Sequence, residues 1–206
     1  MPSITISLFG LGILSGGILL GGLLVSIQSQ SHRFWPHGTR NLTFWLGWTA
    51  WVTYVGSLFG VAYLDWWSWY RPSTLFQLAS LSLLLVGAVV SLWAVWRLGF
   101  RESSGLEGEL NTQGPYRYSR NPQYVSYVLM LVSGSVLTGS WKTAVLALLG
   151  IVWFLLAPFA EEPWLREQYG AAYEAYRESV PRFIGRPRQR PPQKERPNAS
   201  RRDNHD

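Results

Sequence analysis

The fold is decided by residues 122–160, which read PQYVSYVLMLVSGSVLTGSWKTAVLALLGIVWFLLAPFA. The stretch holds two apolar runs, 122–138 and 141–160, with only Gly139 and Ser140 between them. A helix rises about 1.5 Å per residue and the hydrocarbon core of a bilayer is about 30 Å thick, so runs of this length can cross a membrane as helices. Because the separation is so short, we expect the two helices to form an antiparallel hairpin.

Three further apolar runs precede the hairpin, at about residues 4–27, 42–64 and 74–96. None of the five runs alternates apolar and polar residues as a membrane barrel strand does, and helices satisfy their own backbone polar groups inside lipid. Charged residues make up only 15% of the chain, against roughly 25% in soluble domains. We therefore expect an all-α, polytopic membrane protein with about five transmembrane helices, in which residues 1–183 form a single domain.

The segment after the last run has a different composition. Over residues 161–178, four large side chains recur at the spacing of one helical face: Leu165, Tyr169, Tyr173 and Tyr176. This pattern predicts an amphipathic helix that lies along the membrane surface or over a site. Residues 184–206 are rich in Arg, Pro and Gln and poor in apolar residues, which is typical of a disordered basic tail.

Positive charge falls mainly on one side of the predicted spans. Five crossings place the loops 28–41 and 97–121 on the same side as the C-terminus. The opposite side carries only Arg71 and Lys142, whereas these two loops carry Arg33, Arg40, Arg97, Arg101, Arg117 and Arg120. Since Lys and Arg accumulate in cytoplasmic loops, we expect the N-terminus outside and the C-terminus in the cytoplasm. The net charge of +6 then indicates contact with membrane lipids rather than with nucleic acid.

Metal and disulfide chemistry have no support in the composition. The chain has no cysteine, so it offers neither a disulfide framework nor a thiolate ligand. Its three histidines, His32, His37 and His205, do not form a credible metal cluster. We expect no metal site, and no feature of the sequence specifies an oligomeric state.

The loop before the fourth run carries the first candidate site, residues 114–124, which read GPYRYSRNPQY. Asn121 suits the N-cap of a helix and Pro122 suits its first position, so the fourth helix should begin here, at the cytoplasmic interface. Free N–H groups at a helix start favour an anion, and Arg117 and Arg120 add positive charge beside them. The same residues also fit an ordinary helix cap with interfacial arginines bound to lipid phosphate.

Two adjacent carboxylates, Glu161 and Glu162, follow the fifth run. A carboxylate at the hydrocarbon boundary is costly unless a cation or water accompanies it, although an amphipathic helix on the bilayer surface would also explain this segment. Both ends of the hairpin emerge at similar depth, so Arg120, Asn121 and Tyr124 should face the pair across a short gap. Such a pocket suits a zwitterionic ligand that carries both an amine and a carboxylate.

Together these motifs resemble the signature of the isoprenylcysteine carboxyl methyltransferase family, much of which the related membrane phospholipid methyltransferases share. The resemblance covers about residues 95–183 and rests on Leu98-Gly99, Leu110–Gln113, Gly114–Tyr124, Glu161-Glu162, Tyr169-Gly170, Tyr173, Tyr176 and Val180-Pro181-Arg182. It implies an enzyme that uses S-adenosylmethionine as methyl donor. The motif would then form a cytoplasmic catalytic loop, and the cofactor pocket would lie between the start of the fourth helix, the end of the fifth and the helix that follows.

The resemblance also implies roles for single residues. The cofactor pocket would be lined by Tyr116, Asn121, Pro122, Tyr124, Glu161, Glu162, Leu165 and Tyr169. Glu161 or Glu162 would hold the ammonium group of the cofactor. Arg117 or Arg120 would contact its carboxylate or orient the acceptor. The two arginines and Glu162 are therefore the predicted catalytic residues.

One position departs from the family. Where the family usually reads Arg-His-Pro, this chain reads Arg120-Asn121-Pro122, and an asparagine cannot act as a base. Methyl transfer from a sulfonium needs alignment more than a base when the acceptor is already ionised. We therefore favour a carboxylate or thiol on a lipid-like or apolar acceptor, with a lipid amine as the alternative. Two other functions stay open, a membrane reductase of the sterol-reductase type that uses NADPH and a non-catalytic membrane adaptor.

Overall fold

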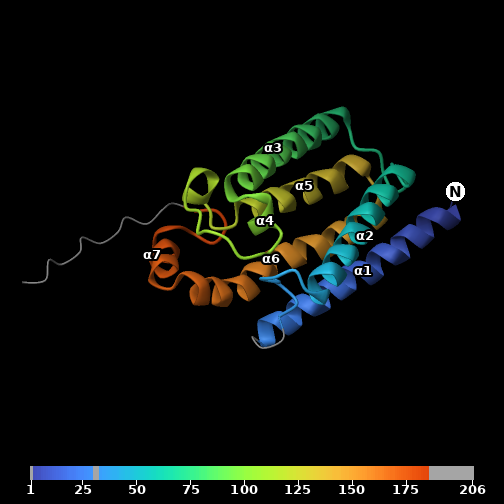
Figure 1. The fold of residues 1–206 in the computed structure, drawn as a ribbon. Coiled ribbons are helices and arrows are strands. Elements are labelled where there is room, and N and C mark those ends of the chain that lie inside the picture. Colours follow the sequence, from blue (N-terminus) through green and yellow to red (C-terminus); the bar gives the residue numbers. More distant parts are fainter. Residues whose placement is uncertain (1, 30–32, 186–206) are drawn as a thin grey trace, which may run out of the picture.

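The computed structural model describes residues 2–29 and 33–185, and its regular structure is helical (Figure 1). The long helices are α1 (Pro2–Gln28), α2 (Leu42–Leu64), α3 (Thr74–Leu98), α5 (Pro122–Thr138) and α6 (Trp141–Tyr169). The short ones are α4 (Phe100–Ser103), the 3₁₀ helix η1 (Gly114–Arg117) and α7 (Ala171–Ser179). Within the described residues there is no β-strand, so the predicted all-α class is confirmed. The predicted basic tail lies outside the described residues from residue 186 onward, as do His32 and His205.

Three helices are long and apolar enough to cross a membrane. In the part of the chain that the structure describes, these are α1 over Ser3–Gln28, α3 and α6, with mean hydropathies of 2.2, 2.3 and 2.3. The helix α5 has only 17 residues, and α2 contains many Trp, Tyr and Thr residues, which lower its hydropathy. The chain is thus an all-α membrane protein. Five crossings and the orientation stay predictions.

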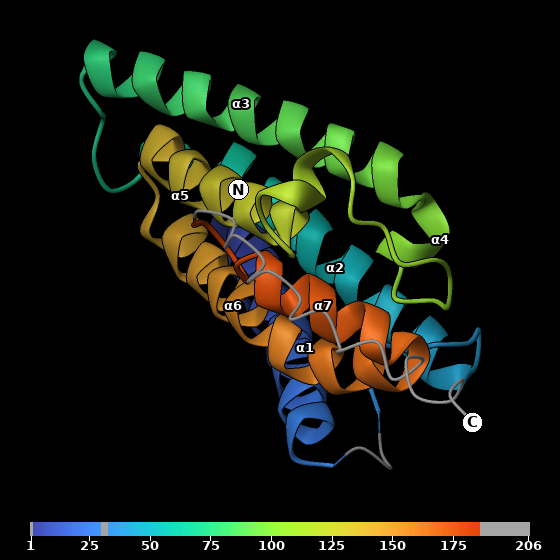
Figure 2. The same cartoon turned by 90° about the vertical axis from the view of Figure 1, so that its left-hand side faces the viewer.

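The long helices form two pairs that α6 joins. The helix α1 packs along α2 and against α6, whereas α3 packs along α5, which in turn packs on α6 (Figure 1). Figure 2 shows α3 at the edge of the bundle, on the outer side of α5. Its outward side chains, among them Leu75, Val89 and Trp96, are exposed in the isolated chain. A helix that is apolar on its outer face is expected to meet lipid there.

The core lies where α1, α2 and α6 meet. It is a buried cluster made of Leu19, Leu23, Tyr54, Trp153, Phe154, Ala157 and Ala160. Across this cluster the Tyr54 hydroxyl donates to the backbone carbonyl of Leu146 at 2.6 Å. The cluster fastens the α1–α2 pair to the stretch of α6 that directly precedes Glu161 and Glu162.

The glycines of α1 have two different surroundings. A Cβ atom added at Gly12 would lie 2.9 Å from the Leu146 side chain and 3.1 Å from the Ser57 side chain. At Gly17 and Gly21 an added Cβ would meet nothing within 4 Å. Small residues let membrane helices approach closely. Gly12 therefore serves the contact of α1 with α2 and α6, whereas Gly17 and Gly21 face outward.

The last long helix ends later than the sequence prediction. We expected the span to end at Ala160 and a separate amphipathic helix to cover 161–178, but α6 continues to Tyr169 before α7 begins. A fall in hydropathy does not interrupt backbone hydrogen bonds. The helix ends at Gly170, which has φ of 52° and ψ of −127°, a conformation that residues with a side chain rarely adopt.

Because the chain turns at Gly170, the predicted amphipathic face is divided between α6 and α7, which pack against each other. Tyr173 and Tyr176 of α7 are buried, and they pack against Leu165 and Tyr169 of α6. The four side chains therefore do not line one straight helix. They form a small cluster that closes the end of the bundle.

Candidate functional site

A pocket lies at the end of the bundle where α5 begins and α6 turns into α7. Its walls come from these helices and from the chain between α3 and α5, and Trp35 and Pro36 of the α1–α2 loop cover it. The predicted site residues that line it are Tyr116, Arg120, Asn121, Tyr124, Glu161, Glu162, Leu165 and Tyr169. Arg117 and Pro122 do not line it, because Arg117 is exposed on η1 and Pro122 is buried in the first turn of α5.

The start of α5 shows how the motif folds. Asn121 occupies the N-cap position and Pro122 follows it as the first helical residue. The Asn121 side chain makes no capping hydrogen bond, unlike an ordinary N-cap asparagine, and its Nδ2 donates to the Arg182 carbonyl at 3.0 Å. Its backbone N–H donates instead to the Ser119 hydroxyl at 3.0 Å. The segment that ends at Arg182 is thereby held against the start of α5.

Glu161 accepts hydrogen bonds from neutral donors. The indole Nε1 of Trp35 donates to its Oε1 at 2.5 Å, and the Tyr124 hydroxyl donates to the same oxygen. Among the described residues no Lys, Arg or His forms an ion pair with Glu161. A carboxylate in such surroundings can bind a cation without displacing one.

Glu162 is held by two guanidinium groups. Arg182 donates to both of its oxygens, from Nε at 2.6 Å and from Nη2 at 2.9 Å, and Nη1 of Arg120 donates at 3.0 Å. The residue is only 6% exposed, so these cations compensate a carboxylate that has lost its water. The same Arg120 nitrogen also donates to the Tyr173 hydroxyl at 3.3 Å. Glu162 therefore already has two positive partners, whereas Glu161 has none in the part of the chain that the structure describes.

Three tyrosines that line the pocket, Tyr116, Tyr173 and Tyr176, keep their protons at neutral pH. Burial raises the pKa of Tyr173 to about 12, and the charge of Glu162 adds to this shift. Burial also raises the pKa values of Tyr116 and Tyr176 well above the ordinary value. The Tyr176 hydroxyl donates to the backbone carbonyl of Tyr116 at 2.8 Å. All three phenols are thus neutral at pH 7 and cannot readily take a proton from an acceptor.

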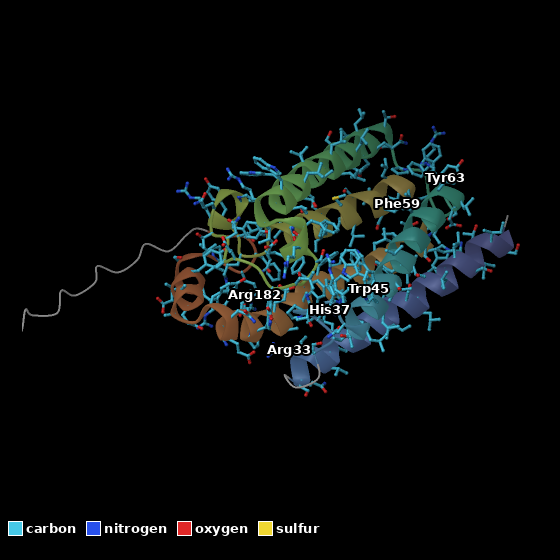
Figure 3. All side chains as sticks on the ribbon, in the orientation of Figure 1. Arg33, His37, Trp45, Phe59, Tyr63 and Arg182 are labelled. Carbon is cyan, nitrogen blue, oxygen red and sulfur yellow. The ribbon has the colours of Figure 1, made fainter. Side chains whose placement is uncertain are left out.

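The α1–α2 loop is held over the pocket by backbone pairing. Gly38 donates its N–H to the Gly105 carbonyl at 2.8 Å, and its own carbonyl accepts from the N–H of Glu107 at 3.0 Å. Arg33 also forms an ion pair with Glu167 of α6. In Figure 3, Arg33 and Arg182 lie at the same end of the molecule, away from Phe59 and Tyr63. These contacts place Trp35 beside Glu161.

Sequence reasoning missed several residues of the pocket. Trp35 is 126 residues from Glu161 and belongs to no motif, so no local signal connects the two. Glu102 and Glu109 also line the pocket. The one available signal for them was their position inside the stretch covered by the family resemblance. Acidic residues in a polar loop otherwise indicate only a solvated surface.

A second cavity adjoins the pocket. It shares Trp35, Ser103, Gln123 and Tyr124 with the first, and its remaining lining is mostly aromatic: Leu19, Phe34, His37, Gly47, Trp48, Trp51, Tyr127, Trp153 and Phe154. Burial lowers the pKa of His37 to about 4, so its imidazole is neutral at pH 7. The second cavity therefore presents a mostly aromatic, uncharged lining next to a charged pocket.

A comparison with protein families finds a match to part of the chain. Residues 75–172 match the model of the phospholipid methyltransferase family, PEMT, whereas no curated protein and no solved structure matches the chain. The matched stretch runs from α3 into the start of α7 and includes Arg120, Asn121 and the Glu161-Glu162 pair. Over this stretch, which supplies most of the pocket, the chain is similar to phospholipid methyltransferases, a family that includes the isoprenylcysteine carboxyl methyltransferases.

Proposed function

We propose that this chain is an integral membrane methyltransferase that uses S-adenosylmethionine to methylate a lipid-like or apolar acceptor. One observation carries the proposal. The stretch that matches the phospholipid methyltransferase model also supplies most of a pocket in which Glu161 lies near Arg120 and the start of α5 and pairs with no cation among the described residues. An anionic group and a cationic group in one pocket are what a zwitterionic cofactor requires.

The residues of the pocket fit both charged ends of the cofactor. Glu161 would hold the ammonium group, because its hydrogen-bond partners are the neutral Trp35 and Tyr124. Glu162 is the poorer candidate, since two guanidinium groups already neutralise it. Arg120 and the N–H groups at the start of α5 would hold the carboxylate. Arg117 lies outside the pocket, so Arg120 is the arginine that the proposal retains.

The rest of the pocket fits a nucleoside. Tyr116, Leu165 and Tyr169 offer aromatic and apolar surface against which a flat base could pack. Glu102 and Glu109 add carboxylate oxygens, which accept hydrogen bonds from ribose hydroxyls. The pocket thus combines the groups expected for each part of S-adenosylmethionine.

The second cavity is the proposed seat of the acceptor. When bound, S-adenosylmethionine supplies an electrophilic methyl group. Trp35 and Tyr124 belong to both cavities, so an acceptor in the aromatic cavity could direct its nucleophile toward the first one. The neighbouring His37 and Tyr116 are poor bases at pH 7, given their pKa shifts. A carboxylate or thiolate acceptor needs no base, and we favour it over a lipid amine.

The proposal includes five membrane crossings, with the N-terminus outside and the pocket at the cytoplasmic side. Two helices, α2 and α5, do not combine the length and the hydropathy of a membrane span on their own, but each packs alongside helices that do. The helix α5 lies against both α3 and α6, and α2 lies against α1 and α6. Their depth in the bilayer would then follow from their neighbours.

The proposal is tested by titrating the purified full-length protein in lipid nanodiscs with S-adenosylmethionine and, separately, with NADPH. We expect heat of binding with S-adenosylmethionine and none with NADPH. Binding of NADPH in its place would favour the reductase. Binding of neither ligand by protein whose circular dichroism melt shows it to be folded would contradict both enzymes and favour the adaptor.

A further inference from the structure

We infer that Arg182, which lies outside the pocket, determines how well the pocket binds the carboxylate of its ligand. It acts through Arg120 and Glu162, with which it forms the arginine clamp (Arg120, Glu162 and Arg182). The inference rests on the proposed function, because it concerns the carboxylate end of S-adenosylmethionine.

Arg182 is fixed firmly on Glu162. Its Nε and Nη2 donate to the two oxygens of the carboxylate at 2.6 and 2.9 Å, which is the strong bidentate geometry of Arg with a carboxylate. Its Cζ also lies 4.2 Å from the centre of the Phe159 ring, a distance at which a guanidinium is attracted to an aromatic face. The side chain is therefore held both by the carboxylate of Glu162 and by the ring of Phe159.

The backbone at Arg182 is fixed to the start of α5. The Pro181 carbonyl accepts from the N–H of Arg120 at 2.9 Å, and the Arg182 carbonyl accepts from Nδ2 of Asn121 at 3.0 Å. Asn121 thus positions Arg182 with a hydrogen bond that involves no titration. This gives the asparagine a role that does not depend on the basicity of the histidine usual in the family.

The charges of the clamp do not cancel. Two guanidinium groups face one carboxylate, which leaves one positive charge. The side chains of Arg120 and Glu162 are only 9% and 8% exposed, so water screens this charge little. Arg166, another cation near Glu162, is paired with Glu174 at 2.8 Å.

The location of the three residues decides which of their charges a ligand in the pocket can reach. Arg120 and Glu162 line the pocket, whereas Arg182 does not. Because Arg182 compensates Glu162, the charge of Arg120 remains available to a ligand carboxylate. Without Arg182, Glu162 and Arg120 would neutralise each other, and a ligand carboxylate would also face the repulsion of Glu162.

The test compares two ligands that differ by one group, S-adenosylmethionine and its decarboxylated form, on the full-length protein in nanodiscs. Arg182→Gln should raise the Kd for S-adenosylmethionine by about tenfold or more, because Glu162 would then neutralise Arg120 and weaken the charge-assisted hydrogen bond from Arg120 to the ligand carboxylate. The Kd for the decarboxylated ligand should change by less than about twofold. Arg182→Lys keeps the charge and should lose less. Arg177→Gln, which breaks an exposed pair with Glu174 on α7, is the matched control and should change neither Kd.

A double variant separates charge from structure. Glu162→Gln combined with Arg182→Gln leaves Arg120 as one uncompensated positive charge, so the affinity for S-adenosylmethionine should recover relative to Arg182→Gln alone. If Arg182 only supported the fold, both ligands would lose affinity together and the double variant would be worse than either single one. That result would overturn the inference. If the unaltered protein binds neither ligand, the proposed function itself fails, and this is known before any variant is measured.

Discussion

Glu161 and Glu162 are neighbours in the chain but have opposite electrostatic surroundings. Successive side chains on a helix point about 100° apart, so the two carboxylates leave α6 in different directions. Glu161 meets the neutral donors Trp35 and Tyr124, while Glu162 meets two guanidinium groups. The sequence predicts that one of the two binds an ammonium group but cannot say which, because Trp35 and Arg182 lie far from the motif along the chain.

Trp35 offers a sharp test of the role of Glu161. Trp35→Phe keeps an aromatic ring over the pocket but removes the indole N–H that donates to Glu161 at 2.5 Å. The loss of a hydrogen bond to a carboxylate should weaken binding of S-adenosylmethionine by about fivefold or more, measured by titration calorimetry. Trp45→Phe is the control, because Trp45 lies on α2 and is 60% exposed. Equal affinities of the two variants would show that Trp35 does not orient Glu161.

Protonation of His37 should make the stability of the folded protein depend on pH. Burial lowers the pKa of its imidazole to about 4, whereas an unfolded chain keeps a value near 6.5. Between these values the unfolded chain binds a proton that the folded chain does not, so stability falls as the pH drops from about 6.5 toward about 4.

The matching variant is His37→Phe, which suits the aromatic rings of Phe34, Trp35 and Phe44 around this position. It removes the titration, so its melting temperature should fall less than that of the unaltered protein between about pH 7 and about pH 4.5. The measurement is thermal unfolding in detergent at both pH values. The same fall in both proteins would mean that His37 does not couple folding to protonation.

At the scale of single elements, helix starts follow from local sequence more directly than helix ends. Asn41 caps α2 by accepting from the N–H of Phe44 at 3.0 Å, and Ser140 caps α6 by accepting from the N–H of Thr143 at 3.2 Å. The end of α6 is different, because the helix continues past Pro163 and past the change in composition at residue 160. It ends only at Gly170, and a lone glycine in a polar segment is a poor signal on its own.

The contact between α1 and its neighbours can be tested with two glycines of the same helix. Gly12→Leu should destabilise the protein by about 1–3 kcal/mol, because its side chain would collide with Leu146 and Ser57. Gly17→Leu should stay within about 0.5 kcal/mol, since that position is open. The free energy of unfolding can be measured in mixed micelles with increasing denaturing detergent. Similar losses in both variants would contradict the packing of α1 described above.

At the scale of the whole molecule, the two halves of the chain contribute different parts of the site. Residues 95–183 carry the motifs, so the sequence could predict that the start of α5 and the end of α6 share a pocket. Trp35 belongs to the α1–α2 loop, and most of the second cavity is lined by α1, α2 and this loop. Their side chains carry no motif and meet the pocket only through tertiary packing, which a single sequence does not reveal.

The proposed orientation has a direct test, because the chain contains no cysteine. Ser73→Cys places a thiol at the exposed start of α3, and Ile184→Cys places one beyond α7 at a position that is 83% exposed. In intact cells, a membrane-impermeant thiol reagent should label Ser73→Cys and should reach Ile184→Cys only after the cells are opened. Labelling of Ile184→Cys alone in intact cells would show the opposite orientation. Labelling of both variants in intact cells would contradict an odd number of crossings.

If the pocket supports methyl transfer, a labelled methyl group from S-adenosylmethionine should appear in an apolar product. The full-length protein in nanodiscs is given membrane lipid extract and apolar carboxylates, and the label in organic-soluble product is counted. We expect transfer by the unaltered protein and by Glu178→Gln, which changes an exposed glutamate of α7. We expect kcat/KM to fall by at least about tenfold in Glu161→Gln. Folded protein that transfers no label to any acceptor, or that transfers it equally well with Glu161→Gln, would contradict the account.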